Sequence, residues 1–436
     1  MSEILLKYRF MSSILPPQEG GRQIVVLTGA RQTGKTTLAK LKYPDLRYIN
    51  LDAPENRSDI RHILTASWSS TIGDAIIDEA QKEPIVFEKI KYAYDESGIS
   101  FSILLGSSQI LLLKNIRESL AGRVAIFELW PLLMSELNAG IYHENYAEDI
   151  QVGAKKPLID KLLSEGLTKN SVDKILSDLP QILLDKEKAF SSASEDYLLK
   201  WGGMPALLHL SSDSERWQWL KNYQYTYLER DLIDLARLDD LEPFTKFQKL
   251  AALRSGKLLN YSELARDTGV SVDTSRRYLE YLKLSYQVAL LHPYYKNITS
   301  SVIKTPKLYW LDIGLLRQLS GQRAEDTGEI YETMVVGEIY KWIKTVQKNT
   351  EMFFYRTRSG FEIDLLLKTE SGLLGMEIKN RQTFVSSDIG NMKNIAEALG
   401  KQWLGGILVY KGNEIRKLSN KTGENIWAVP SNRLFG

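Results

Sequence analysis

A glycine-rich segment that carries a lysine and a hydroxyl group is the part of the sequence best suited to chemistry. Gly29, Gly34, Lys35 and Thr36 fit the spacing G-x-x-x-x-G-K-[ST], between an apolar run and a helical pattern. Lys35 would reach the β- and γ-phosphates of ATP, and the Thr36 hydroxyl would ligate Mg²⁺. The segment therefore predicts an ATP site, whose expected contacts are Gly29, Ala30, Arg31, Gln32, Thr33, Gly34, Lys35, Thr36 and Thr37.

Two acidic residues at the end of a short apolar strand would complete this site. The predicted strand 75–78 ends in Asp78, and Glu79 follows it directly. Asp78 would hold Mg²⁺ through water, and Glu79 would polarise the water that attacks the γ-phosphate. Because both acids are present, the sequence predicts hydrolysis of ATP as well as binding.

Three further polar positions are candidates for contacts with the phosphates. The strand predicted up to Gly106 is followed by Ser107 and Ser108, which would lie beside the acidic strand's end in a parallel sheet. One of these serines would sense the γ-phosphate or the attacking water, or the Gly-Ser-Ser run is only a turn. Arg123 would stabilise charge on the phosphate of its own or a neighbouring molecule, unless it is a plain surface arginine.

A second set of charged residues, near the C-terminus, suggests a metal-dependent site. Asp364 lies on one predicted strand, Glu377 and Lys379 share a face of the next, and Glu338 belongs to a preceding helix. The three acids would ligate Mg²⁺, and Lys379 would activate water and stabilise charge on a phosphate. The spacing D-x(n)-E-x-K is typical of nucleases, although a hairpin with a charged exposed face gives the same letters.

The elements that must position these residues fall into four segments. Strands alternate with helices in the first segment, which predicts a parallel sheet covered by helices. Helical patterns, a helix-turn-helix pattern and a second α/β pattern follow. The expected fold class is a multidomain α/β chain with a P-loop ATPase domain at 1–138, a helical lid or linker at 139–244, a winged-helix-like domain at 245–322 and a restriction-endonuclease-like α/β domain at 323–436.

The third segment offers a candidate DNA contact. Predicted helices at 261–265 and 273–283 have helix-turn-helix spacing, which places Asp273, Arg276 and Arg277 where base or phosphate contacts are usually made. Nearby acidic residues offset the arginines, so the pattern fits DNA contact and a purely packing role about equally well.

Composition limits the class of protein. A chain of 436 residues is too long for one core and predicts several domains. The net charge of +2 argues neither for nor against nucleic acid, and the absence of cysteine excludes disulfides and thiol catalysis. No apolar run has the length of a membrane helix, and no signal segment is recognised. We therefore expect a cytoplasmic protein without a membrane partner.

The segments GARQTGKTT, IIDEAQ, LLGSSQ and SLAGRVAIFELWPLLMSEL occur in this order. In this respect the chain resembles the bacterial and archaeal P-loop ATPases of the AAA superfamily that carry a C-terminal domain of the DUF4143 type. The resemblance runs over nearly the whole chain and implies ATP binding. In that family the C-terminal region resembles PD-(D/E)xK nucleases, which adds to the reading of Asp364, Glu377 and Lys379.

Two functions of different classes remain open at this point. The first is a Mg²⁺-dependent ATPase coupled to a nuclease-like domain that interacts with DNA. The second is an ATP-dependent signalling or scaffold switch whose C-terminal domain binds a partner, or a second copy of the chain, and cleaves nothing. A kinase acting on a small molecule fits less well, because Glu79, Ser107 and Arg123 favour water as the acceptor.

Overall fold

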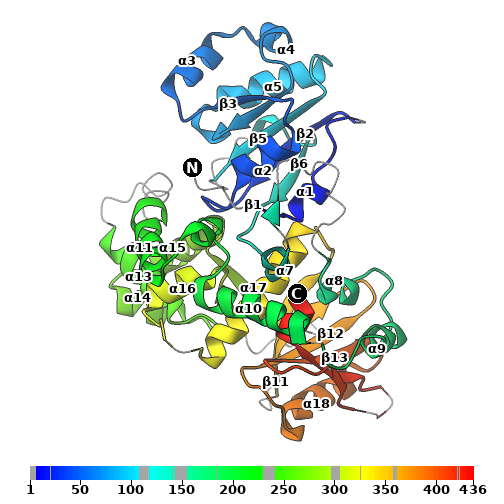
Figure 1. The fold of residues 1–436 in the computed structure, drawn as a ribbon. Helices are drawn as coiled ribbons and strands as arrows, with labels where there is room; N and C mark the ends of the chain where they lie inside the picture. The colour runs from blue at the N-terminus through cyan, green and yellow to red at the C-terminus, as the bar shows by residue number, and fades with distance from the viewer. Residues whose placement is uncertain are drawn as a thin grey trace.

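The computed structural model contains two large β-sheets, one near each end of the molecule, with helices between them (Figure 1). A two-stranded pairing of β1 Leu6–Lys7 with β7 Ile141–Tyr142 adds a third, small sheet. The structure describes residues 6–19, 21–107, 116, 118–139, 141–142, 155–183, 185–228, 241–295, 305–324, 326–356, 361–419, 421 and 423–436.

The N-terminal sheet has five parallel strands in the order β3-β4-β5-β2-β6. Ile24 and Val26 of β2 belong to one core cluster and Val25 and Leu27 to another, because successive side chains of a strand face opposite sides. Burial on both faces explains the continuous apolar run of β2 and confirms the predicted parallel sheet. The elements are β2 Gln23–Thr28, α2 Lys35–Lys42, β3 Arg47–Asn50, α3 Pro54–His62, α4 Trp68–Thr71, β4 Ala75–Asp78, α5 Ile85–Asp95, β5 Phe101–Gly106 and β6 Val124–Glu128.

The helices that follow lie below the N-terminal sheet in the view of Figure 1 and form two groups. α8 Leu158–Leu162 and α9 Lys169–Ser177 lie beside the C-terminal sheet, where Trp427 Nε1 donates to Asp173 Oδ1 at 3.1 Å. α10 Asp185–Trp201 runs past α7 Met134–Asn138 toward the helix-turn-helix region, and α11 Asp213–Tyr223 follows it.

The break after α10 is a tight turn, as its Gly-Gly-Met-Pro sequence predicts. Gly202 has a φ of +73°, which favours glycine. The Gly203 carbonyl accepts from Leu132 N–H at 2.7 Å, and the Gly203 N–H donates to Asp312 Oδ2 at 2.8 Å. This turn therefore ties the end of α10 to the segment between β6 and α7.

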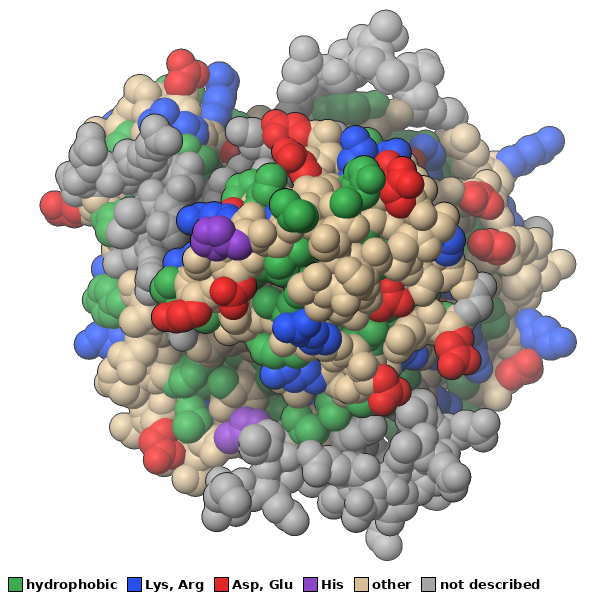
Figure 2. All heavy atoms as spheres, turned by 90° about the horizontal axis from the view of Figure 1, so that it is seen from above, with side chains coloured by type: hydrophobic (Ala, Val, Ile, Leu, Met, Phe, Trp, Pro, Cys, Tyr) green, Lys and Arg blue, Asp and Glu red, His purple; other side chains and the backbone are tan. Residues whose placement is uncertain are grey.

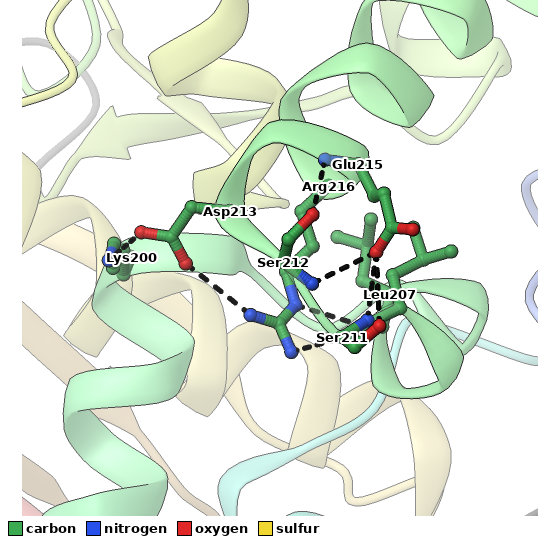
Figure 3. Close-up of polar contacts among 8 residues, drawn as sticks. Lys200, Leu207, Ser211, Ser212, Asp213, Glu215 and Arg216 are labelled. Carbon is green, nitrogen blue, oxygen red and sulfur yellow. Dashed lines mark hydrogen bonds and ion pairs between the residues drawn. The ribbon is translucent and has the colours of Figure 1, made fainter.

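The start of α11 is fixed by a compact set of polar contacts (Figure 3). Ser212 Oγ accepts from Glu215 N–H at 3.2 Å, and Glu215 Oε2 accepts from Ser212 N–H at 2.9 Å, which forms a capping box. The Arg216 guanidinium donates to the Leu207 and Leu210 carbonyls, and Lys200 Nζ lies 2.6 Å from Asp213 Oδ2. These contacts hold α10, the turn Pro205–His209 and α11 together as one unit.

The next region contains three helices and a β-hairpin. Asn260 and Ser271 cap α14 and α15 through their side chains, and Gly269 ends α14 in the left-handed region with a φ of +77°. The two capped helices confirm the predicted helix-turn-helix spacing. The elements are α13 Glu242–Ala252, α14 Tyr261–Thr268, α15 Val272–Leu284, β8 Val288–Pro293 and β9 Lys307–Trp310.

The C-terminal sheet has eight strands in the order β14-β15-β13-β12-β11-β10-β8-β9. The helices α17 Gly328–Thr345 and α18 Gly390–Leu399 lie on opposite faces of this sheet. Met334 and Val335 of α17 share a core cluster with Met376 of β12, whereas Met392 of α18 shares another with Leu366 of β11. The elements are α16 Ile313–Ser320, α17 Gly328–Thr345, β10 Glu351–Arg356, β11 Glu362–Lys368, β12 Leu373–Lys379, α18 Gly390–Leu399, β13 Trp403–Tyr410, β14 Arg416–Lys417, β15 Ile426–Pro430 and α19 Ser431–Phe435.

The hairpin β8–β9 belongs to this C-terminal sheet, because β8 pairs in parallel with β10. One sheet therefore continues across the expected boundary between residues 322 and 323. Within the described residues, no helix combines the length and the apolar character that a membrane crossing needs.

Candidate functional site

The predicted phosphate loop connects the C-terminal end of β2 to the start of α2. Gly34 caps α2 with a φ of +95°, and Gln32 also has a positive φ, of 59°. A Cβ at Gly29 would lie 2.2 Å from the Leu129 carbonyl oxygen, so only glycine fits where the loop passes the end of β6. The loop thus turns tightly into the N-terminus of a helix, which is the geometry that binds phosphate.

The lysine and threonine of the loop have defined partners. The buried Lys35 Nζ donates to the carbonyls of Gly29 at 3.0 Å and Ala30 at 2.8 Å. Thr36 Oγ1 donates to Asp78 Oδ2 at 2.7 Å, which brings the predicted Mg²⁺ ligands together. Asp78 Oδ2 also accepts from Tyr48 OH at 2.8 Å, and burial, together with this contact with the carboxylate, raises the pKa of Tyr48.

Glu79 lies beside the end of the neighbouring strand β5. Its backbone is left-handed, with a φ of 54°, and its N–H donates to Asp78 Oδ1 at 3.0 Å. Ser107 Oγ donates to Glu79 Oε2 at 3.4 Å, and Gln81 Nε2 donates to the same oxygen. The structure therefore brings Ser107 to the expected position beside the acidic strand, while Ser108 lies outside the described residues.

Arg123 lies near the N-terminal ends of the strands of this sheet, whereas the phosphate loop lies at their C-terminal ends. It precedes Val124, which pairs with Ile24 at the start of β2, whereas the loop follows Thr28 at the end of β2. Four residues of strand separate the two levels by roughly 13 Å. The guanidinium instead forms a two-pronged pair with Asp95, at 2.7 and 3.1 Å, and this hydrogen bonding lowers the pKa of Asp95. This arrangement corrects the expectation that Arg123 acts on the nucleotide of its own molecule.

Three side chains that the sequence analysis missed hold the phosphate loop from outside. Arg9 donates to the Thr33 carbonyl at 2.7 Å and to the Trp130 carbonyl at 2.5 Å. Tyr223 OH donates to the Arg31 carbonyl at 3.1 Å, and Tyr286 OH donates to Thr28 Oγ1 at 2.9 Å. The three residues come from distant parts of the chain, so no local motif marks them.

The second set of charged residues gathers at β9, β11, β12 and α17. Asp364 Oδ2 accepts from Ile378 N–H at 2.8 Å, which places it against β12, and Lys379 Nζ lies 2.6 Å from Glu377 Oε1. Lys307 of β9 enters the same cluster, with its Nζ 3.3 Å from Glu332 Oε1 and 3.9 Å from Asp364 Oδ1. The structure thus brings Asp364, Glu377 and Lys379 together, and adds Lys307 and Glu332.

Burial controls the acid–base behaviour of this cluster. Burial, helped by the charge of Asp364, raises the pKa of Glu332 to about 7 and that of Glu377 to about 8. Burial alone would lower the pKa of Lys307, but the carboxylates of Glu332, Asp364 and Glu362 raise it above its ordinary value. Lys307 is therefore a charged ammonium inside the cluster.

Glu338 lies away from this cluster, which corrects its expected place. Its Oε2 accepts from Met134 N–H at 2.8 Å, and its Oε1 pairs with Lys341. Glu332 and Glu338 are six residues apart on α17, which rotates their side chains about 120° from each other. Glu332 is the helical carboxylate that faces Asp364, whereas Glu338 joins α17 to the ATPase side of the molecule.

Three family models match parts of this chain. A model described as an AAA domain matches residues 21–138, and the model of the domain of unknown function DUF4143 matches residues 327–434. A further domain of unknown function, DUF8612, matches residues 193–326.

The similar proteins and solved structures have low sequence identity to this chain. An uncharacterized protein of Mycobacterium tuberculosis is 27% identical over 94% of this chain and 81% of its own length. An uncharacterized protein of Methanocaldococcus jannaschii is 23% identical over 80% and 73% of the two chains. The Walker-type ATPase of Pyrococcus abyssi gives a TM-score of 0.37, with 15% identity over 68% of this chain and 90% of that chain.

The parallel sheet, the phosphate loop and the matching model define residues 21–138 as a P-loop, ATP-binding domain of the AAA type. The two models match in the order expected of P-loop ATPases that carry a C-terminal DUF4143 domain, which confirms the resemblance seen in the sequence.

Proposed function

We propose that this chain is a Mg²⁺-dependent ATPase that works as a nucleotide switch on its C-terminal domain. One observation carries the hydrolytic part of the proposal, which is the meeting of four side chains at the ends of three neighbouring strands. Thr36 Oγ1 lies 2.7 Å from Asp78 Oδ2, and Ser107 Oγ lies 3.4 Å from Glu79 Oε2. Groups for metal binding and for water activation are therefore adjacent.

The donors at this edge of the sheet fit Mg²⁺. The Thr36 hydroxyl and the Asp78 carboxylate are hard oxygen ligands, and phosphate oxygens and water would complete the coordination. When bound, Mg²⁺ would neutralise charge on the phosphates. Among the residues that the structure describes, no three acidic or histidine side chains are grouped to hold a metal. Metal binding at this site is therefore expected to require the nucleotide.

The other residues have roles that follow from their positions. Lys35 would turn from the Gly29 and Ala30 carbonyls to the β- and γ-phosphates when ATP enters the loop. Glu79 would orient the attacking water, and Ser107 and Gln81 would hold the Glu79 carboxylate in place. The loop carbonyls held by Arg9 and Tyr223 would keep the backbone donors directed toward the phosphates.

The hydrolytic part of the proposal is tested by measuring ATP turnover in two variants that should lose activity. Lys35→Ala should prevent ATP binding, and Glu79→Gln should keep binding but lower kcat by about 100-fold or more. Lys42→Ala, on the same helix but away from the loop, serves as the matched control and should turn over ATP at the wild-type rate. Unchanged turnover in both loss variants would refute the assignment.

The junction between the two ends of the molecule supports the switch. Gln347 Nε2 donates to the Ile126 carbonyl of the edge strand β6 at 2.9 Å, beside a cavity of about 590 Å³. This cavity is lined from both sides of the junction, by Glu128 of β6 among others and by Tyr340 and Lys344 of α17. A junction with such a space is not close-packed, which suits a movement between nucleotide states.

Charge pairing favours partner binding over contact with DNA. On the helix-turn-helix unit, Arg276 pairs with Asp273 at 3.4 Å and Arg254 pairs with Asp267 at 2.6 Å. A protein that grips phosphates needs uncompensated positive charge, and these two pairs reduce it. The face seen in Figure 2 likewise has Lys and Arg side chains interspersed with Asp and Glu.

A nuclease assay decides between the two functions. The assay uses circular and linear DNA with Mg²⁺ or Mn²⁺, with and without ATP, and compares wild type with Asp364→Ala. The switch predicts no cleavage by either protein and no stimulation of the ATPase by duplex DNA. Cleavage that is lost in Asp364→Ala would instead establish the nuclease function.

A further inference from the structure

A lysine side chain occupies the middle of the C-terminal acidic cluster. Lys307 Nζ lies 2.8 Å from Glu362 Oε1, 3.3 Å from Glu332 Oε1 and 3.9 Å from Asp364 Oδ1. The Lys307 side chain is only 7% exposed. One ammonium group therefore faces three carboxylates that come from α17 and β11.

The backbone fixes Lys307 in this position. It is the first residue of β9, where it pairs with Leu291 of β8, and it also forms a bridge with Leu258. The Lys307 ammonium lies near the Phe354 ring, 5.6 Å from its centroid. The lysine is therefore held by two backbone pairings and by its charged neighbours, so it is part of the packed sheet.

A divalent metal and this ammonium would compete for the same space. Mg²⁺ and Mn²⁺ bind carboxylate oxygens at roughly 2 Å, so a metal shared by Glu332, Glu362 and Asp364 would lie against the Lys307 nitrogen. Two cations at such a distance repel each other strongly in a buried site. Of the residues predicted to hold a metal, Asp364 is the one that faces this ammonium, so a positive charge already lies beside a predicted ligand.

Other groups of the protein also pair with these carboxylates. Glu332 Oε1 accepts from Tyr309 OH at 2.6 Å, and Glu362 Oε2 lies 3.6 Å from Arg356 Nε. Asp364 Oδ2 accepts from Ile378 N–H. Glu377 Oε2 is different, because it is buried without a hydrogen-bond partner among the described residues. This oxygen is an acceptor that a ligand would satisfy, so the experiment below includes a Glu377 variant.

We infer that Lys307 is a built-in cation that takes the place of the metal ion, so that this domain holds its acidic cluster together without a divalent metal. The cluster then joins the hairpin β8–β9 to α17 and β11. This inference deepens the switch part of the proposed function, because a domain without a metal has no Mg²⁺-dependent nuclease chemistry.

The inference is tested by measuring Mn²⁺ binding to the full chain by electron paramagnetic resonance, in the absence of nucleotide. Wild type, Asp364→Asn and Glu377→Gln should bind the same number of Mn²⁺ ions. Lys307→Met should bind one more ion, and Lys307→Arg, which keeps the charge, should bind no more than wild type. The extra ion should disappear in the double variant Lys307→Met with Asp364→Asn.

Two results would overturn the inference. One is a Mn²⁺ ion bound by wild type and lost in Asp364→Asn or Glu377→Gln, which would show a metal site beside Lys307. The other is a folded Lys307→Met variant that binds no additional ion. If Lys307→Met does not fold, the comparison of wild type with Asp364→Asn and Glu377→Gln still decides.

Thermal unfolding provides an independent readout. Lys307→Met leaves three carboxylates without their counter-ion, so its Tm should fall below that of wild type and rise when Mn²⁺ is added. Wild type should show no such rise. Because these measurements contain no nucleotide, they can fail while ATP hydrolysis through Lys35 and Glu79 succeeds, and the two proposals remain separable.

Discussion

Single residues decide how closely the segments around the ATP site pack. Gly29 lies against the Leu129 carbonyl and Gly203 against the Leu132 carbonyl, where a Cβ would be 2.2 and 2.3 Å from the oxygen. Gly203 also exchanges hydrogen bonds with Leu132 and Asp312. Both glycines therefore let two backbone segments come into contact. A Cβ at either position would clash with backbone, which cannot move aside as a flexible side chain can.

Gly203→Ala tests this view away from the phosphate loop. The added methyl group must displace backbone at Leu132, so the free energy of unfolding should fall by about 1–3 kcal/mol. Gly328→Ala is the control, because Gly328 opens α17 and a Cβ there would have no atom within 4 Å. Chemical denaturation of the two variants measures the difference. Equal stability for both would contradict the close approach at Gly203.

How much of each site the sequence predicted depends on whether its residues follow one another in the chain. Gly34, Lys35 and Thr36 are consecutive, and Asp78 and Glu79 follow one strand, so a parallel sheet sufficed to bring them together. The C-terminal cluster depends on contacts between residues far apart in the sequence, and Lys307 reaches it because β9 joins the same sheet. A lysine before an apolar run gives no hint of this contact.

Among elements, the N-terminal segment before β2 links the phosphate loop to α7. The Arg9 guanidinium donates to the Thr33 carbonyl of the loop and, through Nε, to Glu136 Oε2 of α7 at 3.1 Å. Glu136 also accepts from the N–H groups of Phe10 and Leu133. The side chains of this pair are 11% and 2% exposed, so the charges are largely removed from water.

Arg9→Met should therefore weaken both stability and nucleotide binding. Removal of one partner of a buried ion pair leaves the other uncompensated and costs about 3–5 kcal/mol. Release of the Thr33 carbonyl should raise KM for ATP more than it lowers kcat, because Arg9 holds the loop from outside. A double-mutant cycle with Glu136→Gln, using unfolding free energies, should give a coupling of about 1–3 kcal/mol. Additive losses would indicate that the two side chains act independently.

At the scale of the whole molecule, the C-terminal helix α19 joins regions that are distant in sequence. Ser431 donates to the Glu195 carboxylate of α10, and Tyr331 OH of α17 lies 2.6 Å from Ser431 Oγ. Glu195 is buried, and burial raises its pKa to about 7. One ionisable group therefore sits where the helical segment, α17 and the end of the C-terminal domain meet.

This position predicts a loss of stability as pH rises. The folded state holds a proton on Glu195 up to a pKa of about 7, whereas the unfolded chain releases it near the ordinary value of 4.5. The stabilisation is fully present below pH 4.5 and is lost as pH rises to about 7, with a total of about 3 kcal/mol. Glu195→Gln cannot ionise and keeps an acceptor for Ser431, so the variant should be more stable than wild type at pH 8.

The measurement is the free energy of unfolding of wild type and Glu195→Gln between pH 4.5 and 8. The difference between the two proteins isolates Glu195, because Glu332 and Glu377, whose raised pKa values also lower stability at high pH, are common to both. The variant's advantage should therefore grow with pH and vanish near pH 4.5. Glu165→Gln, at an exposed position between α8 and α9, should show no such trend. A difference that stays constant with pH would mean that Glu195 is already ionised in the folded protein, with its charge compensated by Lys411.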